Sequence, residues 1–258
     1  MIFRKRATMS PTLQHVRRHA LAACGALLLA LPTFAQKAPP VAQGPDLDLS
    51  IRYYTRVLTD EGVLRESRYE ERMLRRRDHV WLARVLPGEA VRGHDDPAHA
   101  VDAEAKATAA THVHKHFNHV VLPRHVVRAG DKTRVEFIDA HAREVIAIAP
   151  TDYDNVNFDG SWSNAFFLVD PQAVAALPLS PRPTVPPGAR WHEREKNGIF
   201  QRVLWDEQRR IPLVVESGNR NGSVFRRIEV KPQAVLATTL PWQNLNGYAQ
   251  KEYADFLD

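Results

Sequence analysis

Apolar and polar side chains alternate along several stretches of the chain, and the first of these begins at Leu47. Over residues 47–57 apolar side chains stand mostly at odd positions, as Leu49 and Ile51 do, and polar ones at even positions. Because successive side chains of a strand point to opposite faces, this period of two predicts a half-buried strand. A turn signal at residues 60–62 and two further stretches, 63–76 and 79–86, extend the prediction to a meander of three strands.

The same alternation returns in the last third of the chain, at residues 199–205, 211–217 and 224–230. Short connections separate these stretches, which is typical of neighbouring antiparallel strands. Residues 133–138 and 144–149 predict two more strands, and the count reaches about eight to ten. We therefore predict a mainly β fold of the α+β class, with a single large curved antiparallel sheet or an incomplete barrel and a few short helices.

Several segments interrupt the strand pattern. Residues 87–110 contain the helix-start signal Asp95-Asp96-Pro97 before an alanine-rich run, which predicts a helical or mobile insertion. Residues 152–160 form an Asx-rich loop, and a short helix is expected from Asp170 to about Leu177. Residues 178–188 are a proline-rich connector, and residues 248–257 predict a short C-terminal helix.

The first 35 residues have the features of a cleavable secretory signal. A basic region that includes Arg4 precedes an apolar run at residues 20–31, and small residues near Ala35 predict cleavage after it. The apolar run is too short to span a bilayer comfortably. An alternative is lipidation of Cys24, although most of the apolar run follows that cysteine. The expected mature protein is periplasmic or secreted, with a disordered tether at 36–46 and a single β-rich domain at 47–258.

Removal of this segment changes the charge balance. The whole chain carries 35 Lys and Arg against 30 Asp and Glu, and residues 1–35 hold five of the basic side chains and no acidic one. The mature chain is therefore balanced, with 35 − 5 = 30 basic and 30 acidic side chains. The surplus typical of nucleic-acid-binding proteins is absent, so we exclude that class. Cleavage also removes the single cysteine, which excludes disulfides and thiol nucleophiles.

A basic run at residues 72–77 is interpreted as a solvated strand face beside a turn.

Residues 111–125 hold five of the twelve histidines. As a strand, which we favour, this segment would place His112, His114 and His116 on one face. The outer two would then stand about 13 Å apart, too far for one metal ion to bind both easily. As a helix, it would instead align His112, His116 and His119. Imidazole suits copper and zinc, but a polar, histidine-rich strand face accounts for the pattern without a metal.

Aromatic side chains gather at residues 162–167. Trp162, Phe166 and Phe167 are expected to pack in the core, and a ligand groove is their alternative role. The sequence contains no nucleophile elbow, phosphate-binding loop or dinucleotide-binding fingerprint. We therefore carry over no catalytic residue and regard an enzyme as the less favoured class.

The hairpin pattern of a secreted chain, together with Trp205, Ile211-Pro212-Leu213 and Gly222-Ser223-Val224, resembles the periplasmic superfamily of outer-membrane lipoprotein carriers and receptors. That superfamily includes a sigma-factor regulatory relative. The resemblance implies an incomplete antiparallel barrel whose concave, apolar face holds acyl chains or a peptide. The histidine-rich stretch and the proline-rich connector depart from the pattern, and the resemblance assigns no functional residue.

Three hypotheses about function follow. The first is a non-catalytic periplasmic binding or carrier module with an apolar groove for a small molecule, a lipid or a peptide, at the periphery of a membrane or free of it. The second is a copper- or zinc-binding protein that uses the His112–His125 stretch, with His112, His114 and His116 as ligands. The third is a hydrolase without a recognisable motif.

Overall fold

The computed structural model describes residues 44–86, 117–183 and 186–257. These residues belong to one compact unit, Ala42–Asp258. The predicted signal peptide, the tether up to residue 43 and the predicted insertion at 87–110 lie outside the described residues. Within the described part of the chain, no helix is long and apolar enough to cross a membrane.

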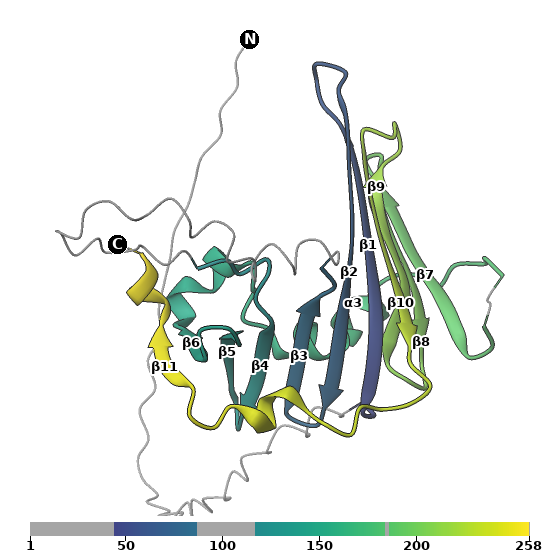
Figure 1. The fold of residues 1–258 in the computed structure, drawn as a ribbon. Coiled ribbons are helices and arrows are strands. Elements are labelled where there is room, and N and C mark those ends of the chain that lie inside the picture. The colour runs from purple at the N-terminus through teal and green to yellow at the C-terminus, as the bar shows by residue number, and fades with distance from the viewer. Residues whose placement is uncertain (1–43, 87–116, 184–185, 258) are drawn as a thin grey trace, which may run out of the picture. The chain divides into compact units, whose positions relative to one another are not determined.

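Eleven strands of the described residues form one open sheet, and this confirms the predicted fold class. The strands are β1 (Leu47–Leu58), β2 (Leu64–Arg76), β3 (His79–Arg84), β4 (Arg124–Ala129), β5 (Lys132–Asp139), β6 (Glu144–Ile148), β7 (Ala189–Lys196), β8 (Ile199–Asp206), β9 (Ile211–Asn219), β10 (Val224–Pro232) and β11 (Ala249–Glu252). Their order in space is β11-β6-β5-β4-β3-β2-β1-β10-β9-β8-β7 (Figure 1). Neighbouring strands run antiparallel except for β11 and β6, which are parallel. The two predicted meanders meet where β1 pairs with β10.

Within the part of the chain that the structure describes, five short helices accompany the sheet. They are the 3₁₀ helix η2 (Pro150–Val156), α2 (Trp162–Phe167), α3 (Pro171–Ala175), and the 3₁₀ helices η3 (Pro241–Asn244) and η4 (Tyr253–Phe256). Asp170 caps α3 by accepting a hydrogen bond from the Gln172 amide, as the predicted helix start requires. The main core lies between α2, α3 and one face of the sheet, where Ile51, Met73 and Val126 are buried. We call this the helix face.

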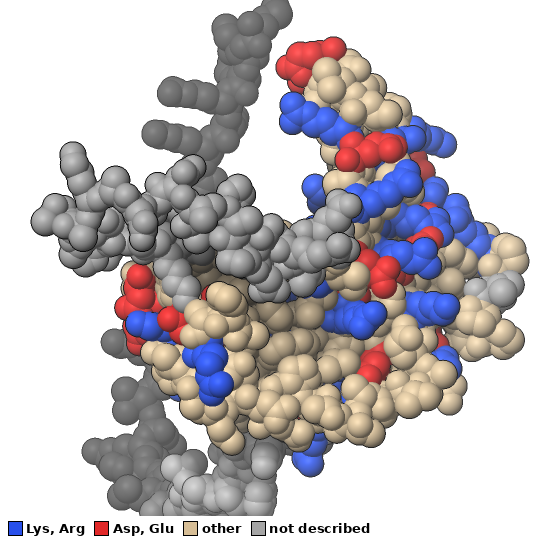
Figure 2. All heavy atoms as spheres, in the orientation of Figure 1, with Lys and Arg blue, Asp and Glu red and all other residues tan. Residues whose placement is uncertain are grey.

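The opposite face of the sheet carries the C-terminal strap, which we define as residues 237–252. Trp242, Leu245 and Tyr248 of the strap pack on Trp81 and on neighbouring apolar side chains of β5 and β6. We call this the strap face. Figure 2 shows Lys, Arg, Asp and Glu side chains gathered on the same face over the long strands β2, β1 and β10. The alternation in sequence thus separates a buried face from a largely charged one.

Two local predictions are wrong, and one strand was missed. The favoured strand at residues 111–125 does not extend over residues 118–122, because Asn118 accepts hydrogen bonds from the following amides and closes a turn. The predicted helix at 248–257 is correct only for η4, because residues 249–252 are not helical but pair with β6 as β11. Strand β7 was missed because this edge strand, ARWHEREK, is mostly polar on both faces. The 152–160 loop is in part the 3₁₀ helix η2.

Gly218 marks a close approach between β9 and β10, and replacement by alanine is expected to destabilise the fold by about 1–3 kcal/mol. A Cβ atom at this position would overlap the carbonyl oxygen of Val224, and backbone cannot move aside as a flexible side chain can. Urea unfolding measures the effect. The neighbouring Ser217→Ala change should stay within about 0.5 kcal/mol of the wild type. Equal stability of both variants would contradict the close packing at Gly218.

Candidate functional site

A cavity of about 240 Å³ opens on the helix face, and we call it the helix-face cavity. Strands β1 to β5, the 119–122 turn and the end of η2 surround it. Its walls are formed by Tyr53, Tyr69, Glu71, Leu82, Arg84, His119, Val120, Leu122, Arg124, Phe137, Val156 and Asn157. The size suits a small ligand or the end of a longer one.

Two tyrosines form an aromatic wall of this cavity. Tyr53 of β1 stands directly opposite Tyr69 of β2, and their rings stack with centroids 4.4 Å apart. Burial, and after it the Glu71 carboxylate, raises the pKa of Tyr53 well above its usual range. Burial and Glu71 raise the pKa of Tyr69 as well. Both phenols therefore stay protonated at physiological pH and can donate hydrogen bonds, one of them from Tyr53 to Glu71.

Three charged side chains line the same cavity. Glu71 of β2 stands opposite Arg84 of β3, whose guanidinium lies 3.5 Å from the ring centroid of Tyr69. Arg124 projects from the start of β4, with its guanidinium 5.9 Å from the ring centroid of Phe158. All three charged residues are half-buried. Two guanidiniums against one carboxylate leave a positive surplus, and the planar guanidinium matches a carboxylate or phosphate group.

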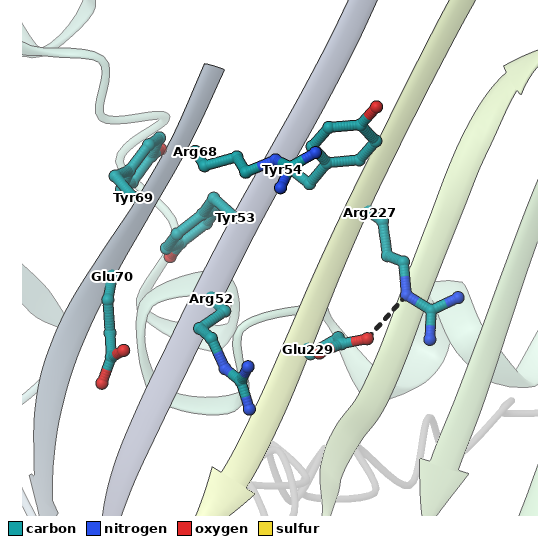
Figure 3. Close-up of a pocket in the computed structure, with 8 residues that line it drawn as sticks. All are labelled: Arg52, Tyr53, Tyr54, Arg68, Tyr69, Glu70, Arg227 and Glu229. Carbon is teal, nitrogen blue, oxygen red and sulfur yellow. Dashed lines mark hydrogen bonds and ion pairs between the residues drawn. The ribbon is translucent and has the colours of Figure 1, made fainter. Parts of the chain in front are cut away.

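A second, more open hollow of about 500 Å³ lies on the strap face, and we call it the strap-face groove. Figure 3 shows its side chains, which come from β1, β2 and β10. It is lined by Arg52, Tyr54, Arg68, Glu70, Arg227 and Glu229, together with Tyr53 and Tyr69. The alternation of side chains places the rings of these last two on the opposite face, so they belong to the floor.

One end of the strap-face groove is occupied by a chain of ion pairs that begins at Arg227. Arg227 forms ion pairs with Glu229 at 2.8 Å (Figure 3) and with Glu216 at 2.6 Å. The chain of pairs continues across the sheet, because Arg202 lies 3.7 Å from Glu216 and 3.4 Å from Glu193. The more exposed of these pairs, such as Arg227–Glu229, contribute about 0–1 kcal/mol each, which is typical of a solvated strand face. The helix-face cavity is therefore the better candidate site.

The predicted metal ligands His112, His114 and His116 lie outside the described residues. Of the remaining histidines in that stretch, His119 lines the helix-face cavity, whereas His125 points to the strap face and lies beside His79. Within the described ranges, no group of three metal-ligating side chains converges on one point. The metal site stays a prediction.

The three aromatic groove candidates lie on and next to α2. Phe166 and Phe167 are each 1% exposed and pack together in the main core. Trp162 is half-buried and lies against the guanidinium of Arg128, 5.1 Å from its ring centroid. Phe166 and Phe167 therefore anchor α2 in the main core. Of the three aromatic side chains, only Trp162 has substantial exposure to solvent. Their role as ligand contacts stays a prediction.

Sequence reasoning missed the charged residues of the helix-face cavity. A signal for them exists, since Glu71 stands on the buried side of the β2 alternation, between Tyr69 and Met73. Arg84 follows the apolar series of β3, and Arg124 precedes that of β4, on the same face of the sheet. An ionisable side chain that points to the buried face of a strand loses part of its hydration, and this costs free energy. Charged side chains kept at such positions are typical of functional sites.

No protein family model and no curated protein sequence matches the chain. Among solved structures, PNGF-II is similar over 81% of this chain, with 11% identity and a TM-score of 0.34, and the chain spans 32% of PNGF-II. An uncharacterized conserved protein from Thermus thermophilus has 10% identity and a TM-score of 0.34, over 79% of this chain and 90% of that one. A Vibrio parahaemolyticus domain described as an outer membrane lipoprotein-sorting protein has 11% identity and a TM-score of 0.28, over 77% and 89% of the two chains.

Proposed function

We propose that the protein is a secreted, non-catalytic binding module that holds a small amphipathic ligand in the helix-face cavity. The observation that carries this proposal is the composition of the cavity wall. Arg84 and Arg124 outnumber Glu71, and apolar side chains such as Leu82 and Leu122 line the remaining wall. This arrangement favours a ligand with one carboxylate or phosphate group and a short apolar portion.

The helix-face cavity also differs from the other candidates in what a ligand would have to displace. In the strap-face groove, Arg227 is already paired with Glu229 and Glu216, and an anionic ligand would have to compete with these two carboxylates for it. A groove at Phe166 and Phe167 would require the main core to open, because both rings are buried. The helix-face cavity needs neither change. Tyr69 keeps its hydroxyl proton and adds a donor for an anionic group, whereas the proton of Tyr53 is directed to Glu71.

A matched set of eight-carbon probes tests this function. Calorimetry with octanoate, octanol and octylammonium should show the tightest binding for octanoate, because only the carboxylate pairs with Arg84 and Arg124. Replacing either arginine with methionine should weaken octanoate binding about tenfold to a hundredfold, which corresponds to a charged hydrogen bond of about 1.5–3 kcal/mol. Binding of octanol should change little.

The control for this test is Arg194→Met, an exposed arginine of β7 at the far edge of the sheet. It should leave octanoate binding unchanged, and circular dichroism should show that all variants keep the β fold. Octanoate that binds no better than octanol, or binding that survives loss of both cavity arginines, would refute the proposed ligand class.

A further inference from the structure

Two histidines on the strap face form a hydrogen-bonded pair under a tryptophan ring. Nδ1 of His79 lies 3.0 Å from Nε2 of His125, and the two rings are nearly parallel, at 11°. The indole of Trp242 stacks on both, with centroid distances of 5.2 Å and 5.3 Å and interplanar angles of 7° and 13°. His125 is buried, and its Nδ1 lies 3.4 Å from the carboxylate of Glu136. The pair therefore provides one flat platform for Trp242.

Trp242 is the middle of three attachments of the C-terminal strap. At its start, the amide of Ala237 donates a hydrogen bond to the carboxylate of Asp48. At its end, residues 249–252 add to the sheet as β11 beside β6. Between them, Trp242 contacts the sheet through the histidine pair and Trp81. Loss of the platform would free the first half of the strap around Trp242, while Leu245 and Tyr248 would still pack on the sheet next to β11.

The strap leads directly to the rim of the helix-face cavity. Helix η4 follows β11, and its Tyr253 and Phe256 contact the ring of Phe117, with centroids 5.3 Å and 6.0 Å away. Phe117 in turn packs edge-on against Phe137, at 5.2 Å, and Phe137 lines the cavity. The 119–122 turn, which forms one wall, begins two residues later. Movement of η4 would therefore reach the cavity wall through Phe117.

We propose that the C-terminal strap is a proton-sensitive latch on the helix-face cavity, closed while the histidine pair is neutral and opened when a second proton breaks the pair. This proposal depends on the proposed function in one respect: the helix-face cavity must be a ligand site. A neutral pair shares one proton between Nδ1 and Nε2, whereas two imidazolium ions would place two donors and two positive charges 3.0 Å apart. Separation of the rings removes the platform under Trp242.

The charges around the pair are nearly balanced in the closed state. Arg76 of β2 stands opposite His79, Glu136 of β5 stands opposite His125, and the Asp78 carboxylate is paired with Arg128 at 2.8 Å. Glu136 is already paired with Arg134, also at 2.8 Å. Glu136 also faces Nδ1 of His125 at 3.4 Å and favours one proton on the pair, whereas a second proton meets the charge of the first across the 3.0 Å contact.

The direction of the pH effect follows from the same surroundings. Burial, and after it His125, lowers the pKa of His79 below its ordinary value of 6.5. His79 binds its proton more weakly in the closed state than in the open state. The closed state is therefore favoured above about pH 6.5, and it loses stability relative to the open state as the pH falls below that value. The latch is thus closed at neutral pH and loosens in mild acid.

Hydrogen–deuterium exchange of the ligand-free protein tests the latch. After correction for the intrinsic pH dependence of exchange, amides of residues 237–252 and 117–124 should exchange at least about tenfold faster at about pH 5.5 than at about pH 7.5. His79→Phe keeps a flat ring that cannot be protonated, so this variant should lose the acceleration in both segments. Trp242→Ala should exchange fast at both pH values, and His141→Phe, at an exposed histidine in the β5–β6 turn, should behave as the wild type.

Three outcomes would overturn the latch. Strap exchange that stays constant or slows in acid would show that a protonated histidine holds Trp242 by a cation–π contact instead. An equal acceleration in His79→Phe would assign the pH effect to other groups. Strap opening without faster exchange at 117–124 would break the link to the cavity. No ligand enters this experiment, so its failure and a failure of octanoate binding are separate results.

Discussion

Replacing Arg75 with methionine is expected to lower the free energy of unfolding by about 3–5 kcal/mol, the cost of losing a buried charged group and its partners. Arg75 is 0% exposed and lies at the centre of the helix face. Its guanidinium donates hydrogen bonds to four backbone carbonyls, those of Pro45, Phe166, Arg209 and Arg210. Methionine fills the space but leaves all four oxygens without their donor.

The Arg75 contacts join three remote segments of the chain: the entry to β1, the end of α2 and the β8–β9 turn. The ring of Phe166 lies 4.7 Å from the guanidinium and adds a cation–π contact. Burial, and after it the charge of Arg210, lowers the pKa of Arg75 to about 10, so the side chain remains charged at neutral pH. The carbonyl dipoles therefore stabilise a charge that has no carboxylate partner within hydrogen-bonding distance among the described residues.

Chemical denaturation of the wild type and Arg75→Met measures this effect, and Arg77→Met provides the control. The Arg77 side chain is 79% exposed just beyond the same strand, so its loss should change stability by less than about 0.5 kcal/mol. A cost below about 1 kcal/mol for Arg75→Met would mean that water or a shifted backbone satisfies the four carbonyls.

Arg75 also shows where sequence reasoning succeeds and where it stops. The alternation of β2 predicts a strand and assigns Met73 and Arg75 to the same side, and that side is buried. We nevertheless interpreted the 72–77 run as solvated, because a charged side chain on a buried face needs partners that the local sequence does not reveal. Those partners stand about 30 to 135 positions away. The solvated interpretation is wrong for Arg75 and correct for Arg77.

The fold itself was largely predictable, because alternation is a local property. Strands β1, β2, β8, β9 and β10 lie close to their predicted ranges. Strand β11 was not predictable in this way, since its four residues have no apolar side and owe their conformation to pairing with β6. The helix-face cavity is likewise a product of the topology. Its wall residues come from five strands, β1 to β5, that are far apart in the sequence. Tyr53, Glu71 and Arg124 therefore come together only after the sheet has formed.

Replacing Asp48 with alanine is expected to cost about 3 kcal/mol and to release the start of the C-terminal strap at every pH. The Asp48 carboxylate is buried, pairs with Arg76 at 2.7 Å and accepts the Ala237 amide at 2.6 Å. Alanine leaves a buried guanidinium and a backbone amide without their acceptor. This loss of about 3 kcal/mol is at the low end of the range for breaking a buried ion pair, because Arg76 keeps hydrogen bonds to the carbonyls of Leu47 and Ala237.

The Asp48 variant separates anchoring of the strap from the histidine latch. Because no titrating group is removed from beside His79, exchange of residues 237–241 should rise equally at acidic and neutral pH, and the acid acceleration around Trp242 should remain. Asp46→Ala is the matched control, since Asp46 reaches the same arginine only at 3.9 Å and its side chain is 50% exposed. Its cost should lie within about 0.5 kcal/mol. If Asp46→Ala and Asp48→Ala destabilise equally, burial of the Asp48 carboxylate contributes nothing beyond surface charge, and the strap is held by its other contacts, which are the packing of Trp242, Leu245 and Tyr248 and the pairing of β11.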